Sequence, residues 1–155
     1  MPAKKWAFED FVVGDVIELG SKRAVAEEIV AFASEFDPQP MHLDEEAGAA
    51  SILGGLSASG WHTCAMFMRL LCDGLLLAST CEGSPGIDYV KWKKPVLAGD
   101  ELFAAVKVVA TRVSKSRPAI GLVTIHSEMK NQDGVIVLEM ENTIMFGKRA
   151  AGAAA

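Results

Sequence analysis

The sequence lacks several features that mark other classes of protein. Its 155 residues contain no block of lysine and arginine, and the net charge is −5 with a pI of about 5.2, so we expect no nucleic-acid partner. Only three cysteines are present, and this small, odd number fits a reduced, cytoplasmic protein better than a disulfide-bonded one. Neither Cys-x-x-Cys nor His-x-x-x-His spacing occurs, so we expect no metal site.

Long apolar runs are also missing. The longest apolar stretch, residues 61–78, is interrupted by His62, Arg69, Asp73 and Gly74. A membrane-spanning helix rarely tolerates so many polar groups. The N-terminal stretch MPAKKWAFEDF is charged and does not have the apolar core of a signal peptide. We therefore expect a cytoplasmic protein with no membrane partner.

The chain has enough hydrophobic residues to form one core. A chain of this length is expected to form a single domain, which we place at residues 1–148. The alanine-rich end, residues 149–155, is predicted to be a disordered tail. Half of the residues are hydrophobic and the mean hydropathy is +0.25. This richness suggests that a partner subunit covers some apolar surface.

Helical periodicity predicts three helices in the first half of the chain. Apolar side chains recur at helical spacing over residues 24–36. A short helix capped by the Asp44 carboxylate is expected to run through EEAGAAS. The third helix, over residues 60–78, is apolar almost all round, which predicts that it is buried on most of its sides.

The second half is rich in strand-like runs. These are IDYVKWKKPV, ELFAAVKVVATRV, GLVTIHSEMK and VIVLEMENTIMF, and the shorter VIEL precedes the first helix. Asp133-Gly134 is a hairpin signal between the last two runs. One long buried helix followed by four or so long antiparallel strands leaves few arrangements, because the sheet must curl around the helix. The expected fold is therefore a single α+β hot-dog domain, with a curled antiparallel sheet wrapped around a long central helix.

The stretch FDPQPMH, residues 36–42, follows the first helix and combines an acid and an imidazole with two prolines. The prolines fix their own backbone angles and hold Asp37 and Gln39 extended. Catalytic groups need a geometry that is fixed before substrate arrives, and a carboxylate with an imidazole can hold one water and move its protons. Asp37 and His42 are therefore the candidate catalytic pair. The alternative is that each only caps a neighbouring helix.

The small-residue stretch GGLSASG, residues 54–60, leads into the long helix. It lacks the Gly-Lys-Ser/Thr ending of a phosphate loop. It is either a flexible connector or a place where substrate approaches the backbone, with the free N–H groups of the helix start facing a developing negative charge. The spacing alone leaves both interpretations open.

The other histidines and the basic residues have simpler interpretations. We expect His62 to be a hydrogen-bonded core or interface residue, and His126 to have a structural role in a strand. The basic residues of the second half are expected on a solvated face, with neutralisation of a coenzyme's phosphates as the alternative: Lys91, Lys93, Lys94, Arg112, Lys115 and Arg117.

With these residues in hand, the chain resembles the MaoC-like dehydratases, the hot-dog (R)-specific enoyl-CoA hydratases, from Phe11 to Phe146. Their motif has the form Asp-x-Asn-Pro-hydrophobic-His, and residues 37–42 read DPQPMH. Gln39 stands where asparagine is usual, and Gly48 stands where a small alanine or serine is common. These departures bear on the substrate more than on the acid–imidazole pair.

The resemblance implies reversible hydration of a trans-2-enoyl-CoA to an (R)-3-hydroxyacyl-CoA. It implies no cofactor except the coenzyme A that the substrate carries, and at least a homodimer with the substrate tunnel at the subunit interface. Asp37 and His42 would hold the attacking water, and backbone N–H groups near Gly60 would hold the carbonyl oxygen. The residues implied to bind substrate are Gln39, Gly55, Ser59 and Gly60.

Two alternatives stay open beside this activity. One is an acyl-CoA thioesterase of the same fold, which generally needs a carboxylate on the central helix; WHTCAMFMRL has none, and Asp73 comes late. The other is a non-catalytic subunit that binds acyl thioesters, although a binder has no need of a proton-transferring pair. The acyl group and its carrier, coenzyme A or acyl carrier protein, also stay open.

Overall fold

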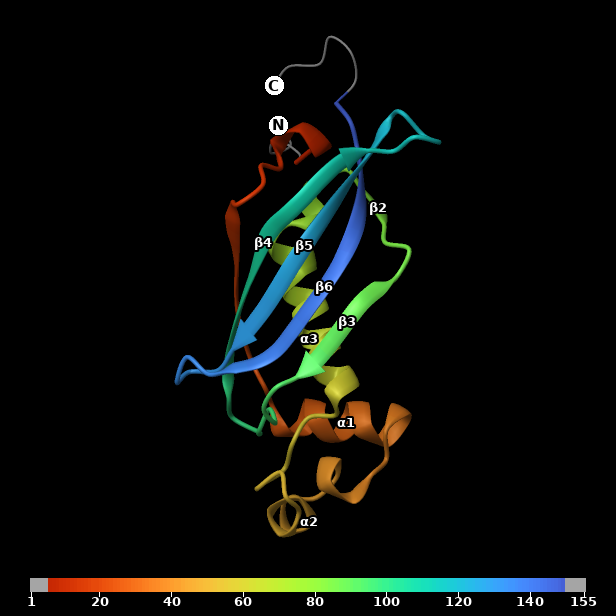
Figure 1. The fold of residues 1–155 in the computed structure, drawn as a ribbon. Coiled ribbons are helices and arrows are strands. Elements are labelled where there is room, and N and C mark those ends of the chain that lie inside the picture. The colour runs from red at the N-terminus through yellow and green to blue at the C-terminus, as the bar shows by residue number, and fades with distance from the viewer. Residues whose placement is uncertain (1–5, 150–155) are drawn as a thin grey trace.

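The computed structural model describes residues 6–149, which form one antiparallel sheet curled around a helix (Figure 1). The sheet has six strands, and its order is β1-β4-β5-β6, with β2 and β3 both pairing with β6 at the far edge. The strands are β1 (Val16–Arg23), β2 (Cys81–Gly83), β3 (Ile87–Trp92), β4 (Glu101–Val113), β5 (Ile120–Lys130) and β6 (Ile136–Gly147). The short β2 was not predicted.

Residues 6–149 contain three α-helices, in the predicted order. They are α1 (Ala26–Phe36), α2 (Glu45–Ala50) and α3 (Gly60–Gly74), accompanied by short 3-10 helices η1 (Phe8–Asp10), η2 (Pro40–His42) and η3 (Leu76–Ala78). Asp44 caps α2 as predicted, since its carboxylate accepts the Ala47 N–H at 2.9 Å. In Figure 1, α1 and α2 lie together beyond one end of the sheet, close to the start of α3.

The sheet curls because one face of each long strand is apolar and must cover α3. Along β5, burial alternates residue by residue, which is the period-two pattern of a half-buried strand. The inward side chains pack against the buried face of α3, and the largest fully buried residues include Phe67, Met66, Leu71, Leu102, Ile125, Met129, Leu138 and Phe146. This architecture is the hot-dog fold, as predicted.

The hairpin between β5 and β6 is also confirmed. Gly134 has a φ of +75°, a conformation that glycine adopts without steric cost. The Asn131 N–H donates to the Val135 carbonyl at 3.0 Å and closes the turn. The turn fixes the antiparallel register of β5 and β6.

The long helix differs from its prediction in two respects. It ends at Gly74 rather than Ala78, because Gly74 lies against the Leu19 backbone: a Cβ there would be 2.9 Å from the Leu19 Cα. The chain then turns through η3. The helix is also not covered all round, since Trp61 is 64% exposed and Met68 46% exposed. One apolar face of α3 therefore meets solvent in the single chain.

The predicted tail lies almost wholly outside the described residues. Arg149, at its start, is described and forms an ion pair with Asp10, with the guanidinium Nη2 2.6 Å from Oδ2; residues 150–155 are outside the described range. Within residues 6–149, no helix combines the length and the apolar character needed to cross a membrane.

Candidate active site

The proline-containing loop after α1 brings its acid and its imidazole together. The Asp37 N–H donates to the Ala33 carbonyl at 2.9 Å and ends α1. Gln39 is extended, with φ −79° and ψ 143°, as its position before Pro40 predicts. Pro40 then opens η2, which ends at His42. As a result, Nε2 of His42 lies 3.5 Å from Oδ2 of Asp37.

The orientation of His42 is set by a backbone carbonyl. Its Nδ1 lies 2.7 Å from the Ser57 carbonyl oxygen, and the imidazole is almost fully buried. A carbonyl oxygen can only accept, so Nδ1 must carry the hydrogen. In the neutral ring, Nε2 is then the acceptor, and it faces Asp37.

Both oxygens of the Asp37 carboxylate accept hydrogen bonds. The Ser59 hydroxyl donates to Oδ2 at 2.6 Å, and the Gln39 amide donates to Oδ1 at 2.7 Å. The Ser59 hydroxyl first, and then the Gln39 amide, hold the pKa of Asp37 below its usual value. Donors stabilise the charged form of a carboxyl group, so Asp37 is an anion at neutral pH.

This arrangement leaves two acceptors facing each other. The distance of 3.5 Å between Nε2 of His42 and Oδ2 of Asp37 is long for a direct hydrogen bond. A water molecule carries two hydrogens and could donate one to each acceptor. The pair can therefore hold and polarise a water beside whatever occupies the neighbouring cleft.

Ser59 links this pair to the start of α3. Besides donating to Asp37, its Oγ accepts the Trp61 N–H at 3.3 Å, and its carbonyl accepts the Thr63 N–H at 2.9 Å. Among the hydrogen bonds of residues 6–149, none engages the Gly60 N–H. A free N–H at a helix start is a suitable partner for developing negative charge on a ligand.

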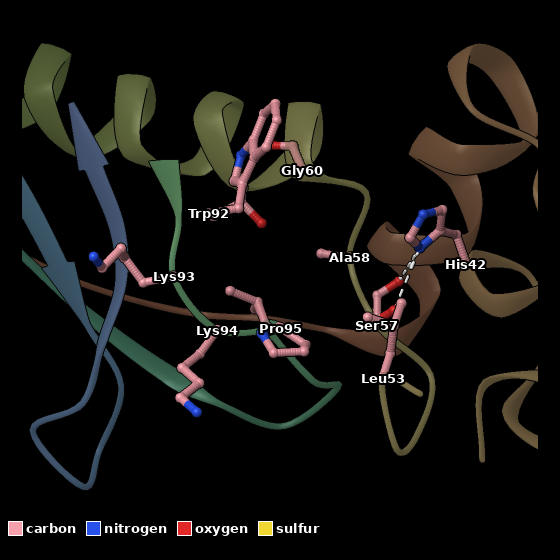
Figure 2. Close-up of a pocket in the computed structure, with 11 residues that line it drawn as sticks. His42, Leu53, Ser57, Ala58, Gly60, Trp92, Lys93, Lys94 and Pro95 are labelled. Carbon is pink, nitrogen blue, oxygen red and sulfur yellow. Dashed lines mark hydrogen bonds between the residues drawn. The ribbon is translucent and has the colours of Figure 1, made fainter. Parts of the chain in front are cut away.

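A cleft of about 270 Å³ lies beside this helix start and the end of β3. Figure 2 shows His42 and Ser57 on one side of it and Trp92 with Gly60 on the other. The cleft is mostly apolar and is lined by His42, Leu53, Ser57, Ala58, Gly60, Thr63, Trp92, Lys93, Lys94, Pro95 and Val96. His42 is thus the member of the acid–imidazole pair that faces the cleft.

The predicted site residues fall into two groups. Asp37, Gln39 and Ser59 form one hydrogen-bonded cluster, His42 faces it with Nε2 3.5 Å from Oδ2 of Asp37, and Gly60 follows Ser59 at the cleft. Gly55 does not line the cleft; it is buried beside α2. A Cβ built on Gly48 would lie 2.3 Å from the Gly55 carbonyl oxygen, so the two backbones are in direct contact. This contact explains why glycine, rather than alanine or serine, stands at position 48.

The sequence analysis missed two contributors to the site. Ser57 acts through its main-chain carbonyl, and any residue supplies a carbonyl, so no side-chain pattern marks it. Trp92 closes one side of the cleft, and the only signal was an aromatic residue late in a strand. Lys93 and Lys94, which the alternative interpretation assigned to phosphates, do line the cleft.

The prediction for His62 was wrong in one respect. His62 is buried and stacks on Phe32, with ring centroids 4.8 Å apart and planes at 10°. Its Nδ1 has no hydrogen-bond partner, although we expected a hydrogen-bonded residue. Burial lowers the pKa of His62, because desolvation disfavours the charged imidazolium.

Within residues 6–149, no group of three or more histidine, cysteine, aspartate or glutamate side chains is arranged to hold a metal ion. The site is made of an anionic carboxylate, an imidazole of fixed tautomer, a helix start and an apolar cleft. These parts suit proton transfer and the stabilisation of an oxyanion.

Comparisons with known proteins agree with this geometry. A sequence model of the family described as "MaoC like domain" matches residues 11–130. A Bacillus subtilis (strain 168) protein described as uncharacterized protein YdeM is 30% identical over 138 residues, covering 89% of this chain and 96% of that protein.

Two solved structures are informative. The MaoC-like dehydratase from Rhodospirillum rubrum is 42% identical, with a TM-score of 0.84, over 92% of this chain and 97% of that one. The (R)-hydratase from A. caviae involved in PHA biosynthesis is 28% identical, with a TM-score of 0.71, over 88% of this chain and 97% of that one.

Proposed function

Because this chain belongs to the MaoC-like family, we propose that it reversibly hydrates a trans-2-enoyl thioester to an (R)-3-hydroxyacyl thioester. The observation that carries the proposal is the pair of facing acceptors, Nε2 of His42 and Oδ2 of Asp37, beside an apolar cleft. Hydration of a conjugated double bond needs a water held and polarised next to an apolar chain. The likeness to an (R)-hydratase supports the same chemistry.

In this mechanism His42 is the base. Both oxygens of Asp37 already accept hydrogen bonds, from Ser59 and Gln39, and its lowered pKa makes it a weak proton acceptor. Nε2 of neutral His42 is the stronger acceptor of the two. As the water oxygen bonds to C3 of the substrate, one water hydrogen passes to Nε2, and the Asp37 anion stabilises the imidazolium that results.

The negative charge that develops on the thioester carbonyl oxygen needs a hydrogen-bond donor. The C2–C3 π electrons move toward the thioester carbonyl, whose oxygen becomes an enolate oxygen. The Gly60 N–H at the start of α3, which lines the cleft, supplies a donor for this oxygen. His42 then returns its proton to C2 on the face that the water attacked, so H and OH add to the same side.

The thioester carrier is proposed to be coenzyme A. Lys93 and Lys94 line the cleft and their side chains are exposed, so they can pair with phosphate groups without being desolvated. The reaction then requires no other cofactor, and we propose that it takes place in the cytoplasm.

We also propose that the chain works as a homodimer. The exposed face of α3 carries Trp61 and Met68, and β3 is an edge strand that pairs on one side with β6 and carries exposed Ile87 and Trp92. Apolar side chains beside an unpaired strand edge favour association with a second chain.

A thioesterase is the less favoured activity. The carboxylate on α3 is Asp73, which lies in the exposed last turn, paired with Arg69 at 2.8 Å between Nε and Oδ2. It is separated by about three and a half helical turns from Gly60, at the other end of the helix. A purely binding subunit would gain nothing from the cluster around Asp37.

Purified protein is expected to hydrate crotonyl-CoA to (R)-3-hydroxybutyryl-CoA, followed by loss of enoyl absorbance and by chiral analysis of the product. Asp37→Asn and His42→Ala should each lower kcat by roughly 10²–10⁴-fold while thermal unfolding stays cooperative. Unchanged rates in both variants would contradict the proposal. Release of free thiol without hydration would favour the thioesterase.

A further inference from the structure

Trp92, Lys93 and Lys94 line one side of the cleft, which we call the carrier side. The Trp92 indole is held there by the backbone of Gly60. Its Nε1–H donates to the Gly60 carbonyl at 2.8 Å, and a Cβ built on Gly60 would lie 2.6 Å from Cε2 of Trp92. Trp92 is nevertheless 45% exposed. A fixed apolar ring therefore lies beside the proposed oxyanion donor, with surface left for a ligand.

The geometry of a thioester decides which part of the substrate meets this ring. The carbonyl carbon is planar and is bonded to oxygen, C2 and sulfur, so C2 and sulfur leave it in different directions. With the oxygen at the Gly60 N–H and C3 near His42, the acyl chain runs toward His42. Sulfur then points away from His42, to the side of the cleft where Trp92 packs on Gly60 (Figure 2). The chain attached to sulfur therefore passes along the indole.

This chain is chemically the same in the two common carriers. Coenzyme A and acyl carrier protein both present a pantetheine arm, in which pairs of methylene groups alternate with amides. The arm is uncharged up to its phosphate, so it can pack on an aromatic ring without desolvating an ion. Each methylene that it buries contributes a factor of about four in affinity. Two such methylenes on the indole would contribute roughly tenfold.

Beyond the indole, the carrier side becomes basic. Lys93 is paired with Glu139, with 3.9 Å between Nζ and Oε2. Lys94 is exposed and has no acidic partner within 4 Å among residues 6–149. The sequence of features along the chain is an indole followed by lysines. It matches the order of the pantetheine arm and the phosphates in coenzyme A.

We propose that Trp92 is a specificity-determining residue for the carrier, because its indole binds the pantetheine arm and so places the thioester oxygen at the Gly60 N–H. This inference rests on the proposed function, and it leaves the proton chemistry to Asp37 and His42. Binding energy from a part of the substrate that does not react can orient the part that does. Loss of the indole should therefore cost more for thioesters that carry the arm than for those that lack it.

The test compares crotonyl-pantetheine with S-ethyl thiocrotonate, which share the acyl group and differ in what the sulfur carries. Trp92→Ala should lower the pantetheine-to-ethyl ratio of kcat/KM by about tenfold. Trp92→Leu should lower it by about threefold, and it covers an alanine variant that fails to fold. A displacement of Gly60 in either variant affects both thioesters and cancels in the ratio.

Two control variants separate the ring from its surroundings. Trp92→Phe keeps an aromatic ring but lacks the N–H that donates to the Gly60 carbonyl, so the ratio should stay within about twofold of wild type. Leu53→Ala changes the His42 side of the cleft (Figure 2) and should also leave the ratio within about twofold. A fall with Leu53→Ala as large as with Trp92→Ala would overturn the assignment of the arm to the indole.

Lys94→Ala separates the two sources of the arm. It should lower the ratio of kcat/KM for crotonyl-CoA to that for crotonyl-pantetheine by about threefold at low salt, because only the first carries the phosphates of coenzyme A. An unchanged ratio, together with faster turnover of crotonyl–acyl carrier protein than of crotonyl-CoA, would assign the arm to acyl carrier protein.

Calorimetry with coenzyme A itself gives a readout that needs no turnover. Trp92→Ala should weaken its binding by about tenfold, and Trp92→Phe by less than about twofold. If crotonyl-CoA is hydrated but neither the ratio nor the binding changes in Trp92→Ala and Trp92→Leu, the role of Trp92 is refuted and the hydratase stands. If no enoyl thioester is hydrated but binding weakens as expected, the hydratase is refuted and the arm contact stands. If neither occurs, both are refuted.

Discussion

His42 and His126 each have carboxylate oxygens within 4 Å, yet their surroundings differ. His126 is on the outer face of β5. Its Nε2 is 3.3 Å from Oε1 of Glu128 and 3.8 Å from Oε1 of Glu139. Its Nδ1 is 3.2 Å from the Tyr89 hydroxyl and 3.6 Å from Oε2 of Glu141. Its side chain is 23% exposed, against 8% for His42. His126 has more acidic neighbours, but it does not line the cleft beside His42.

The difference shows what an acid–imidazole contact needs before it can do chemistry. Around His126 both ring nitrogens face possible acceptors, so either tautomer can be satisfied. Around His42 the Ser57 carbonyl fixes the tautomer, one acceptor faces Asp37, and the ring borders an apolar cleft. Fixed tautomer and adjacent apolar space, rather than the number of carboxylates, distinguish the two clusters.

The largest expected effect tests this comparison directly. His42→Gln should lower kcat for crotonyl-CoA hydration by roughly 10²–10⁴-fold, since glutamine cannot accept the water's proton. His126→Gln should leave kcat within about threefold. Both variants are measured by the same spectrophotometric assay, and an equal loss in the two would mean that the distinction drawn from tautomer and cleft is wrong.

The next effect concerns how tightly the loop around His42 is built. Gly48→Ala should lower the free energy of unfolding by about 1–3 kcal/mol, because its Cβ meets the Gly55 carbonyl and the backbone must shift. The matched control is Gly86→Ala, where no atom lies within 4 Å of the new Cβ and φ is not in the left-handed region; it should change stability by less than about 0.5 kcal/mol. Urea unfolding measures the free energy of unfolding of both variants. Similar values for the two would show that the backbone around Gly48 and Gly55 can shift to accept the new Cβ at little cost.

The smallest effect tests whether the Ser59 hydroxyl acts on the Asp37 carboxylate charge. Ser59→Ala removes both the α3 cap and the donor to Asp37, and should cost about 1 kcal/mol at pH 7 and about tenfold in kcat. The Ser59 hydroxyl lowers the folded-state pKa of Asp37. The hydrogen bond therefore stabilises the folded protein fully above the unfolded-state pKa of Asp37, about 3.9. This stabilisation is lost as pH falls through the folded-state pKa.

The stability gap between wild type and Ser59→Ala should therefore narrow below about pH 4. Ser79→Ala is the control: this buried hydroxyl donates to the Leu76 carbonyl and touches no acid in the hydrogen bonds described. The difference in stability between wild type and Ser79→Ala should not depend on pH. A Ser59→Ala gap that stays constant down to pH 3 would mean that the hydroxyl does not act on the Asp37 charge.

The sequence predicted which helices and strands form better than it predicted the residues at which they end. Period-two burial in β4 to β6 and the Asp133-Gly134 turn are local signals, and the structure matches them. The end of α3 at Gly74 depends on its packing against Leu19, 55 residues earlier. No local pattern contains that contact, and the prediction of a helix to Ala78 failed for this reason.

The same division holds for the site. Asp37 and His42 were found from one stiff loop because proline chemistry is local, whereas Gln39 was assigned to the site only through the family resemblance. The Ser57 carbonyl that orients His42 and the indole that closes the cleft come from distant segments. Ser57 lies in the loop before α3, paired with Leu97, and Trp92 ends β3, so their roles follow only from the folded chain.

The double use of Ser59 has a consequence for how this site can change. One hydroxyl both caps the helix whose start is proposed to hold the thioester oxygen and donates to the acid beside His42. A new substrate or a substitution that displaces this helix start would therefore have two effects at once. It would change the hydrogen bond to the thioester oxygen, and it would change the hydrogen bonding of the Asp37 carboxylate beside His42. Adaptation to a new acyl group should then begin at cleft-lining residues outside this hydrogen-bonded group, such as Leu53 and Val96.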